Sequence, residues 1–152
     1  MRSIISTLTS FLEAKLITAD VLFDLKQYEE SLTCYNFVLT VNDASSHAAK
    51  GKVYCYTEME KFEEAVLASR DFKFEKLSDP LIFIGLFKAG NELIKKIMKG
   101  DYHGLYLHSV TEVESKCISY LDYAFKYANK NFQLLKDIAF FYYQMKKYQN
   151  VF

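Results

Sequence analysis

The sequence has no tryptophan, one proline and only five glycines among 152 residues. Glycine and proline supply most of the tight turns between β-strands, so their scarcity disfavours a β-sheet architecture and predicts helices. An excess of charge is also lacking, because 19 basic residues balance 19 acidic ones. A neutral chain has no net attraction to a nucleic acid or an anionic membrane, so neither is expected as a partner. The longest apolar runs, residues 81–87 and 138–143, are too short to span a bilayer.

Residues that would indicate a compartment or a cofactor are equally scarce. The three cysteines, Cys34, Cys55 and Cys117, follow no metal-binding or redox spacing. Scattered free thiols are typical of a reducing compartment and predict an intracellular protein, cytoplasmic or nuclear. The apolar residues at the N-terminus are interrupted by Ser and Thr, and Glu13 comes early. They are therefore interpreted as one face of a helix rather than as a signal peptide.

Acid–base chemistry has only three candidate residues, Asp101, His103 and His108, in a glycine-containing stretch. Loop residues of this kind are more often solvated than catalytic or metal-ligating. The sequence contains no glycine-rich phosphate loop and no nucleophile motif. An enzyme or a nucleic-acid binder is therefore the less favoured interpretation, and no metal ion or cofactor is expected.

An internal repeat is the main feature that the sequence does contain. QYEESLTCY at residues 27–35 and KFEEAVLAS at residues 61–69 are offset by 34 residues. Tyr28 corresponds to Phe62, and a pair of glutamates follows in both copies. A fixed period of this length indicates helix-turn-helix units that stack on one another.

The repeat resembles that of the tetratricopeptide (TPR) family. The C-terminal part fits the family's first helix with Leu135, Ile138, Ala139 and Tyr142, and it places Tyr148 in the turn that follows. The resemblance implies an all-α fold, a right-handed α-solenoid of about seven helices. We expect these helices near residues 3–26, 29–41, 46–59, 62–74, 80–98, 108–128 and 132–146.

The resemblance also implies a single TPR-like domain over residues 1–152. Gly85 and Ala139 occupy equivalent positions but lie 54 residues apart, so an insertion is expected between them. The repeats are then predicted at about 12–45, 46–79, 80–131 with an insertion near 99–114, and 132–152, which is incomplete.

Helix starts and close helix contacts can be predicted from local residue types. Side chains that cap a helix N-terminus occur at Asp43 with Ser45 and Ser46, at Ser78-Asp79-Pro80, and at Asn129 and Asn131. Small residues that let neighbouring helices approach closely are Ala19, Ala65, Gly85, Ala124 and Ala139.

TPR proteins bind partners in a concave groove lined by the first helix of each repeat, and the resemblance implies the same here. The groove positions are Glu13, Leu16, Asp20, Phe23 and Asp24 in the first repeat, His47, Lys50, Tyr54, Thr57 and Glu58 in the second, and Gln133, Lys136, Phe140, Tyr143 and Gln144 in the last. Nine of them are the expected partner-binding residues, namely Leu16, Asp20, Phe23, Lys50, Tyr54, Glu58, Lys136, Phe140 and Tyr143. This mixture of aromatic and charged side chains suits a partner peptide or helix. The carboxylate clamp of heat-shock co-chaperones is not expected, because Asp20 stands where a bound carboxylate would lie.

The last residues, FFYYQMKKYQNVF at 140–152, are rich in aromatics that a stacked repeat normally covers. Two interpretations remain open: the chain continues as a longer repeat protein, or another chain covers this surface. The function that the TPR resemblance favours is an interaction scaffold, a subunit or N-terminal fragment of a larger multi-protein assembly. Residues 19–38 are similar to a first repeat in scaffold subunits of the anaphase-promoting complex, although most of them are generic repeat positions, so an assembly of that kind is one expectation. The alternative is homodimerisation through the apolar N-terminal residues Ile4, Ile5, Leu8, Phe11 and Leu12 or through the aromatic C-terminus.

Overall fold

The computed structural model describes residues 3–100 and 109–149. Within these ranges it contains seven α-helices, two short 3-10 helices and no β-strand, which confirms the all-α prediction. The helices are α1 (Ile4–Asp24), α2 (Tyr28–Val41), α3 (Ser46–Glu58), α4 (Phe62–Ala68), η1 (Ser69–Asp71), η2 (Phe74–Lys76), α5 (Pro80–Met98), α6 (Val110–Ala128) and α7 (Phe132–Gln149).

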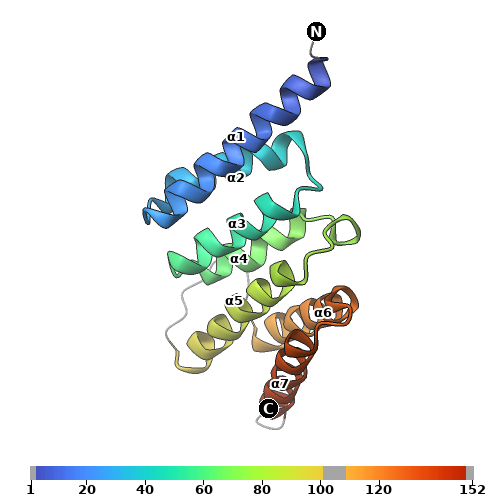
Figure 1. Cartoon of the computed structure of the whole chain (residues 1–152). Helices are drawn as coiled ribbons and strands as arrows, with labels where there is room; N and C mark the ends of the chain where they lie inside the picture. The colour runs from blue at the N-terminus through green and yellow to red at the C-terminus, as the bar shows by residue number, and fades with distance from the viewer. Residues whose placement is uncertain (1–2, 101–108, 150–152) are drawn as a thin grey trace.

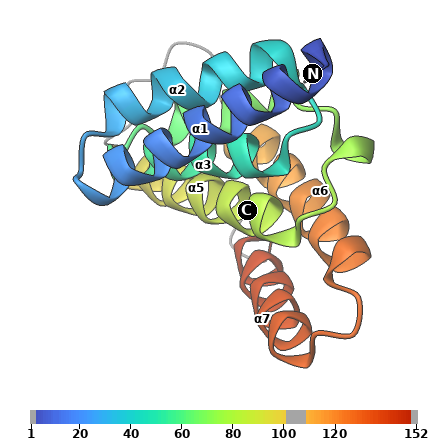
Figure 2. The ribbon, with the colours of Figure 1, turned by 45° about the horizontal axis from the view of Figure 1, so that its top comes forward.

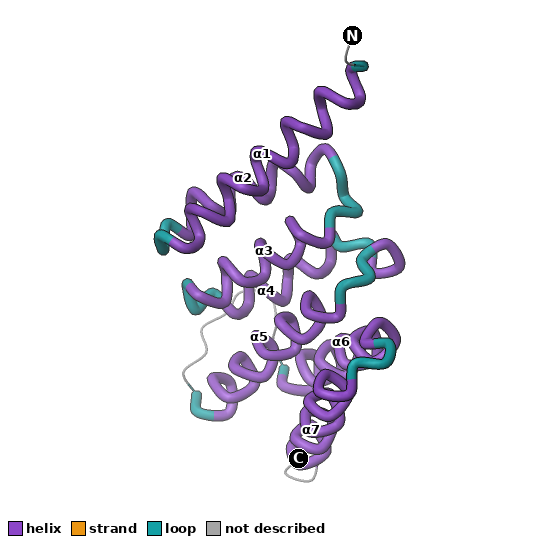
Figure 3. Tube along the Cα trace, in the orientation of Figure 1, coloured by secondary structure: helices purple, strands orange, loops and turns teal. Residues whose placement is uncertain are grey.

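The helices form antiparallel pairs that stack in chain order (Figure 1). Helix α1 lies against α2, α3 against α4, and α5 against α6, while α3 also contacts α1, α2 and α5. Figures 1 and 2 both place α1 at one end of the stack and α7 at the other. The described connections between paired helices are short, as Figure 3 shows. First helices α1, α3 and α5 therefore follow one another along one side of the array.

The turn inside the first helix pair recurs in the second. Lys26 and Glu60, 34 positions apart, both adopt the left-handed region, with φ of 63° and 57°. In each turn the next residue donates its backbone N–H to the carbonyl five residues earlier, at 2.8 Å in both cases. This hydrogen bond closes the C-terminus of a helix and reverses the chain. The sequence period thus corresponds to a repeated backbone conformation.

Polar side chains begin several helices as predicted. Ser45, Asp79 and Asn131 each accept a hydrogen bond from a backbone N–H of the first turn, at 3.2, 2.9 and 3.1 Å. These bonds satisfy donors that have no partner inside the helix. Asp43 was predicted to cap the same helix as Ser45, but its carboxylate instead forms an ion pair with Nζ of Lys73, at 2.5 Å.

The helix predicted over 62–74 is wrong in its C-terminal part, because α4 ends at Ala68. The hydroxyl of Ser69 donates to a carbonyl in the last turn of α4 at 2.6 Å and lies 2.7 Å from the buried hydroxyl of Tyr120 on α6. The chain then becomes extended, and the ring of Phe74 packs edge-on against aromatic rings of α5 and α6. Tertiary contacts therefore override the helical pattern here. Helix α7, by contrast, continues through Tyr148, which was predicted in a turn.

Two hydrophobic clusters form the interior, and α3 contributes to both. Ala48 and Cys55 face the cluster shared with α1 and α2, whereas Ala49 and Val53 face the larger cluster around α5. Helix α5 is the most buried helix of the array, with eleven buried residues. The α1–α2 pair is thus joined to the rest of the array mainly through α3.

Four of the five predicted small contact residues are buried, namely Ala19, Ala65, Gly85 and Ala124. The fifth, Ala139, is exposed on α7 and is therefore not buried between helices as predicted. The predicted insertion at 99–114 overlaps the undescribed residues 101–108 and stays a prediction. Helix α6 already begins at Val110.

Candidate functional site

An open cleft of about 310 Å³ lies between α1 and α3, on the side of the first helices. It brings together side chains of the first two helix pairs that are distant in sequence. Its lining consists of Asp20, Phe23, Asp24, Tyr35, His47, Lys50, Gly51 and Tyr54. Four of the nine expected partner-binding residues are among them, namely Asp20, Phe23, Lys50 and Tyr54, together with two further predicted groove positions, Asp24 and His47.

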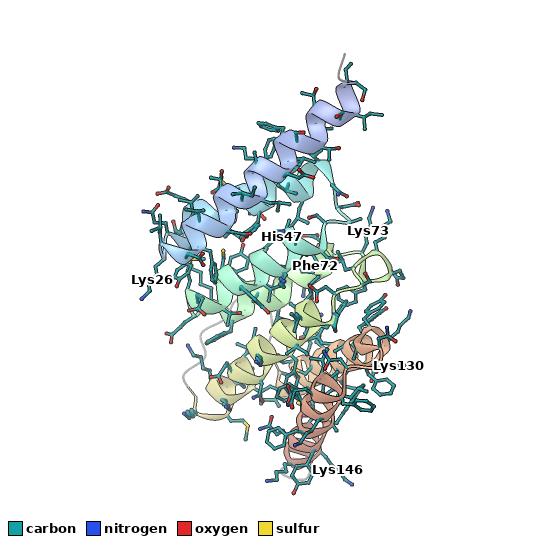
Figure 4. The ribbon with its side chains drawn as sticks, in the orientation of Figure 1. Lys26, His47, Phe72, Lys73, Lys130 and Lys146 are labelled. Carbon is teal, nitrogen blue, oxygen red and sulfur yellow. The ribbon has the colours of Figure 1, made fainter. Side chains whose placement is uncertain are left out.

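The carboxylate of Asp20 is held in place by two donors from different helices. The hydroxyl of Tyr35 on α2 donates to Oδ1, and Nε2 of His47 on α3 lies 2.9 Å from both carboxylate oxygens. Figure 4 labels His47 on α3, beside α1. Burial, together with the hydrogen bond and the charge of Asp20, raises the pKa of Tyr35 well above its usual value. Tyr35 therefore remains a neutral donor at neutral pH.

The cations of the cleft are paired with carboxylates. Nζ of Lys50 lies 3.6 Å from Oδ2 of Asp79, whose other oxygen caps α5. Tyr54, one turn further along α3, is half-buried, and burial followed by the charge of Asp79 raises its pKa. Asp24 is exposed, and its side chain forms no hydrogen bond or ion pair with any described residue.

The floor of the cleft depends on a glycine in the middle of α3. A Cβ at Gly51 would lie 2.3–2.5 Å from three ring atoms of Tyr35, well inside van der Waals contact. Only glycine therefore lets this ring pass close to α3 and reach Asp20. The groove prediction missed both residues. Tyr35 belongs to a second helix, whereas that prediction considered first helices only, and Gly51 lies on a first helix but not at one of its groove positions. A glycine inside a predicted helix was the one available signal.

The other predicted groove residues lie elsewhere. Leu16 packs into the small core cluster of α1 and α2, and Glu58 is exposed on α3 outside the cleft. Lys136, Phe140 and Tyr143 lie on α7, where the last two line a separate cleft of about 170 Å³ with Gln144 and Lys147. Figures 1 and 2 show α1 and α7 at opposite ends of the stack. The predicted set thus divides between two surfaces.

Acid–base candidates Asp101, His103 and His108 lie outside the described residues. Among the residues that are described, no group of three or more His, Cys, Asp or Glu side chains is placed to hold a metal ion. None of the described helices combines the length and apolarity that crossing a bilayer requires. The prediction that the protein is not an enzyme stays a prediction.

Comparison with solved structures finds a likeness in fold. The type III secretion translocator chaperone SycD of Yersinia enterocolitica, in a crystal structure described as an alternative dimer, matches with a TM-score of 0.63. The match covers 92% of this chain and 95% of that chain at 15% sequence identity. No family model matches the sequence, and neither does any curated protein. At this identity the likeness concerns the fold and not the function.

Proposed function

We propose that this chain, which has a TPR-like fold, is a protein-binding module that holds a partner peptide or helix in the α1–α3 cleft. The cleft is the observation that carries the proposal. It is open, lies on the first-helix side of the array, and combines aromatic rings with charged groups. SycD, which shares the fold, is described as a chaperone for translocator proteins.

The composition of the cleft suits a polypeptide partner. Phe23 and Tyr54 supply partly buried rings that can cover an apolar side chain of a partner. Aromatic anchors of this kind provide much of the affinity at protein interfaces, while polar groups around them set the orientation. Asp20 and Lys50 are already hydrogen-bonded or ion-paired and provide fixed polar groups at the edge.

A phage-displayed peptide library panned on the whole chain tests this proposal. We expect enriched peptides that, added to the labelled protein, shift the amide resonances of Phe23, Asp24 and Tyr54 in NMR spectra. Tyr54→Ala should weaken binding of a selected peptide by roughly 30-fold, as for an interface anchor. Phe125→Ala, which removes a ring that is 60% exposed on α6, serves as the control and should leave binding unchanged.

Two results would contradict the proposed function. One is that no peptide is enriched; the other is that the enriched peptides shift resonances of α7 or α6 and leave the cleft unchanged. The NMR mapping needs no substitution, so a loss of stability in Tyr54→Ala cannot imitate either outcome.

Membership of a larger assembly, whether of the anaphase-promoting type or another, is a further proposal, and it needs evidence beyond the cleft. The same holds for a cytoplasmic or nuclear location. A pull-down with the whole chain, analysed by mass spectrometry and repeated with Tyr54→Ala, is the measurement that addresses both. Partners that depend on Tyr54 would identify the assembly.

Homodimerisation is the second candidate function, favoured by the N-terminal half of α1. Ile4, Ile5, Leu8 and Phe11 are 88%, 78%, 44% and 48% exposed. Residues 3–12 contain no charged side chain, and Figure 1 shows this part of α1 extending past the end of α2. An exposed apolar surface without charge can pair with a copy of itself, because no like charges oppose each other.

Light scattering across a concentration series tests the dimer. We expect a mass that rises with concentration for the natural chain and a monomer for Leu8→Asp. Ile17→Asp introduces the same charge on α1 at a residue that is 64% exposed and lies two turns away, and it should leave the dimer intact. A monomer at every concentration would remove this candidate.

A further inference from the structure

We propose that the α1–α3 cleft recognises a basic side chain, arginine or lysine, of the bound partner, with Asp24 as its ion-pairing group. The inference rests on the proposed function and adds the chemistry of the partner. Asp24 lies in the last turn of α1, at the edge of the cleft formed with Phe23 and Tyr54.

The position of Asp24 is electrostatically unfavourable in the unbound chain. The C-terminus of a helix carries partial negative charge, so an anion in its last turn is disfavoured and a cation is preferred. Asp24 occupies that last turn, and no described Lys, Arg or His pairs with it. A cation supplied by a partner would offset both its charge and that of the helix end.

The remaining charges of the cleft also favour a cation. Three carboxylates, Asp20, Asp24 and Asp79, lie in the cleft or beside it, together with one lysine, Lys50, and the imidazole of His47. The carboxylates outnumber these two basic groups. Lys50 is paired with Asp79, and His47 is bound to Asp20. An acidic group of a partner would therefore face Asp24 without a free cation among the described residues of the cleft.

Aromatic rings provide the second element of recognition for a basic side chain. Phe23 and Tyr54 line the cleft beside Asp24, and Phe23 is fixed by an edge-on contact with Tyr28 at 5.2 Å between ring centroids. A guanidinium or ammonium group is attracted to the face of such a ring, and the apolar stem of its side chain packs against the ring. Carboxylate and rings together thus match both the charged end and the stem.

The direct test uses N-acetyl-arginine methylamide as the probe, titrated into the labelled whole chain by NMR. N-acetyl-citrulline methylamide has nearly the same shape and no charge, and N-acetyl-glutamate methylamide carries the opposite charge. We expect the arginine probe to shift the amides of Phe23, Asp24 and Tyr54, and to bind about three-fold or more tighter than citrulline. The glutamate probe should be the weakest.

Substitutions locate the effect. Asp24→Asn should weaken the arginine probe about three-fold and leave the citrulline probe unchanged. Glu58→Gln removes the same charge from an exposed residue of α3 outside the cleft and should change neither. Asp24→Asn should also leave the melting temperature unchanged or slightly higher, because an unfavourable charge at a helix end is removed. A melting temperature that is unchanged or higher would show that weaker binding in Asp24→Asn does not result from unfolding.

Equal binding of the arginine and citrulline probes, or tighter binding of glutamate, would overturn the inference. So would an equal effect of Asp24→Asn and Glu58→Gln, since the charge would then act from any surface position. Peptides selected by phage display separate the two proposals. If they shift the cleft resonances but contain no preference for Arg or Lys, the binding module stands and the basic side chain is refuted.

Discussion

The close contact between α5 and α6 predicts that replacing a glycine of α5 by alanine lowers the stability of the protein, whereas helix propensity alone predicts an increase. Gly90 lies inside α5, and a Cβ there would be 2.4 Å from Sγ of Cys117 on α6. In an exposed helix, replacing Gly by Ala stabilises the protein by about 1 kcal/mol. Here both residues are buried, and overpacking of a core costs about 1–3 kcal/mol.

The overlap exceeds 1 Å by the usual van der Waals radii and places the overpacking cost near the upper limit of about 3 kcal/mol. After subtraction of the gain in helix propensity of about 1 kcal/mol, we expect Gly90→Ala to destabilise the protein by roughly 2 kcal/mol. Cys117→Ala should cost about 1 kcal/mol through the lost contacts of the sulfur. In the double variant the new methyl group occupies the space left by the sulfur. Its stability should therefore exceed the additive expectation by roughly 2 kcal/mol.

Urea unfolding followed by circular dichroism at 222 nm measures these free energies, and each 1 kcal/mol corresponds to a shift of about 2–4 °C in Tm. Gly85→Ala is the comparison on the same helix, where the nearest atom, Cε1 of Tyr54, is 3.1 Å away. Its cost should be smaller than that of Gly90→Ala. A stabilised Gly90→Ala variant, or strict additivity in the double variant, would refute the close packing of α5 on α6.

Two further predictions concern buried groups. Burial, followed by the charge of Glu114, raises the pKa of Cys117 from 9.0 to about 12. The unfolded thiol ionises first, so its contribution to stability is complete below pH 9.0 and decreases as the pH rises toward about 12. Urea unfolding at pH 8 and 10 should show a loss of stability roughly 1 kcal/mol smaller in Cys117→Ala than in the natural chain; equal losses would contradict this assignment. Tyr120→Phe removes a buried hydroxyl that lies 2.7 Å from Oγ of Ser69 and should cost about 1 kcal/mol. Tyr123→Phe, whose hydroxyl contacts Glu75 only at 3.5 Å, should change the free energy of unfolding by less than about 0.5 kcal/mol, and an equal cost for both would contradict the role of the Ser69 contact.

Two exposed apolar surfaces, on the N-terminal half of α1 and on α7, could be predicted from the sequence to different extents. The apolar N-terminal half of α1 was predicted from the spacing of Ile4, Leu8 and Phe11, and these residues are exposed. On α7, Phe140 and Tyr143 are 56% and 58% exposed, whereas Phe141 packs on Phe87 at 4.7 Å between ring centroids. Four consecutive aromatics thus separate into a partly buried face, with Phe141 and Tyr142, and an exposed face. That separation required the position of α5.

Features that depend on neighbours within one helical turn were predictable from the sequence by itself. Ser45 and Asp79 cap helices because their side chains reach the N–H groups two or three residues ahead. The turns at Lys26 and Glu60 share a conformation because the residues around them repeat at the same spacing. The hydrogen bonds involved are local, so their pattern is present in the residue order and gives the all-helical repeat.

Features that depend on which helices meet were decided only by the tertiary structure. Helix α4 ends at Ala68 because Ser69 and Phe74 contact α6, which begins more than thirty residues later. Tyr35 reaches the cleft because Gly51 leaves room for its ring. Such contacts join residues whose distance in sequence carries no periodic signal, and their energy comes from close packing in three dimensions. The residue order therefore determined the repeating helices, and their packing determined where the α1–α3 cleft lies and which side chains line it.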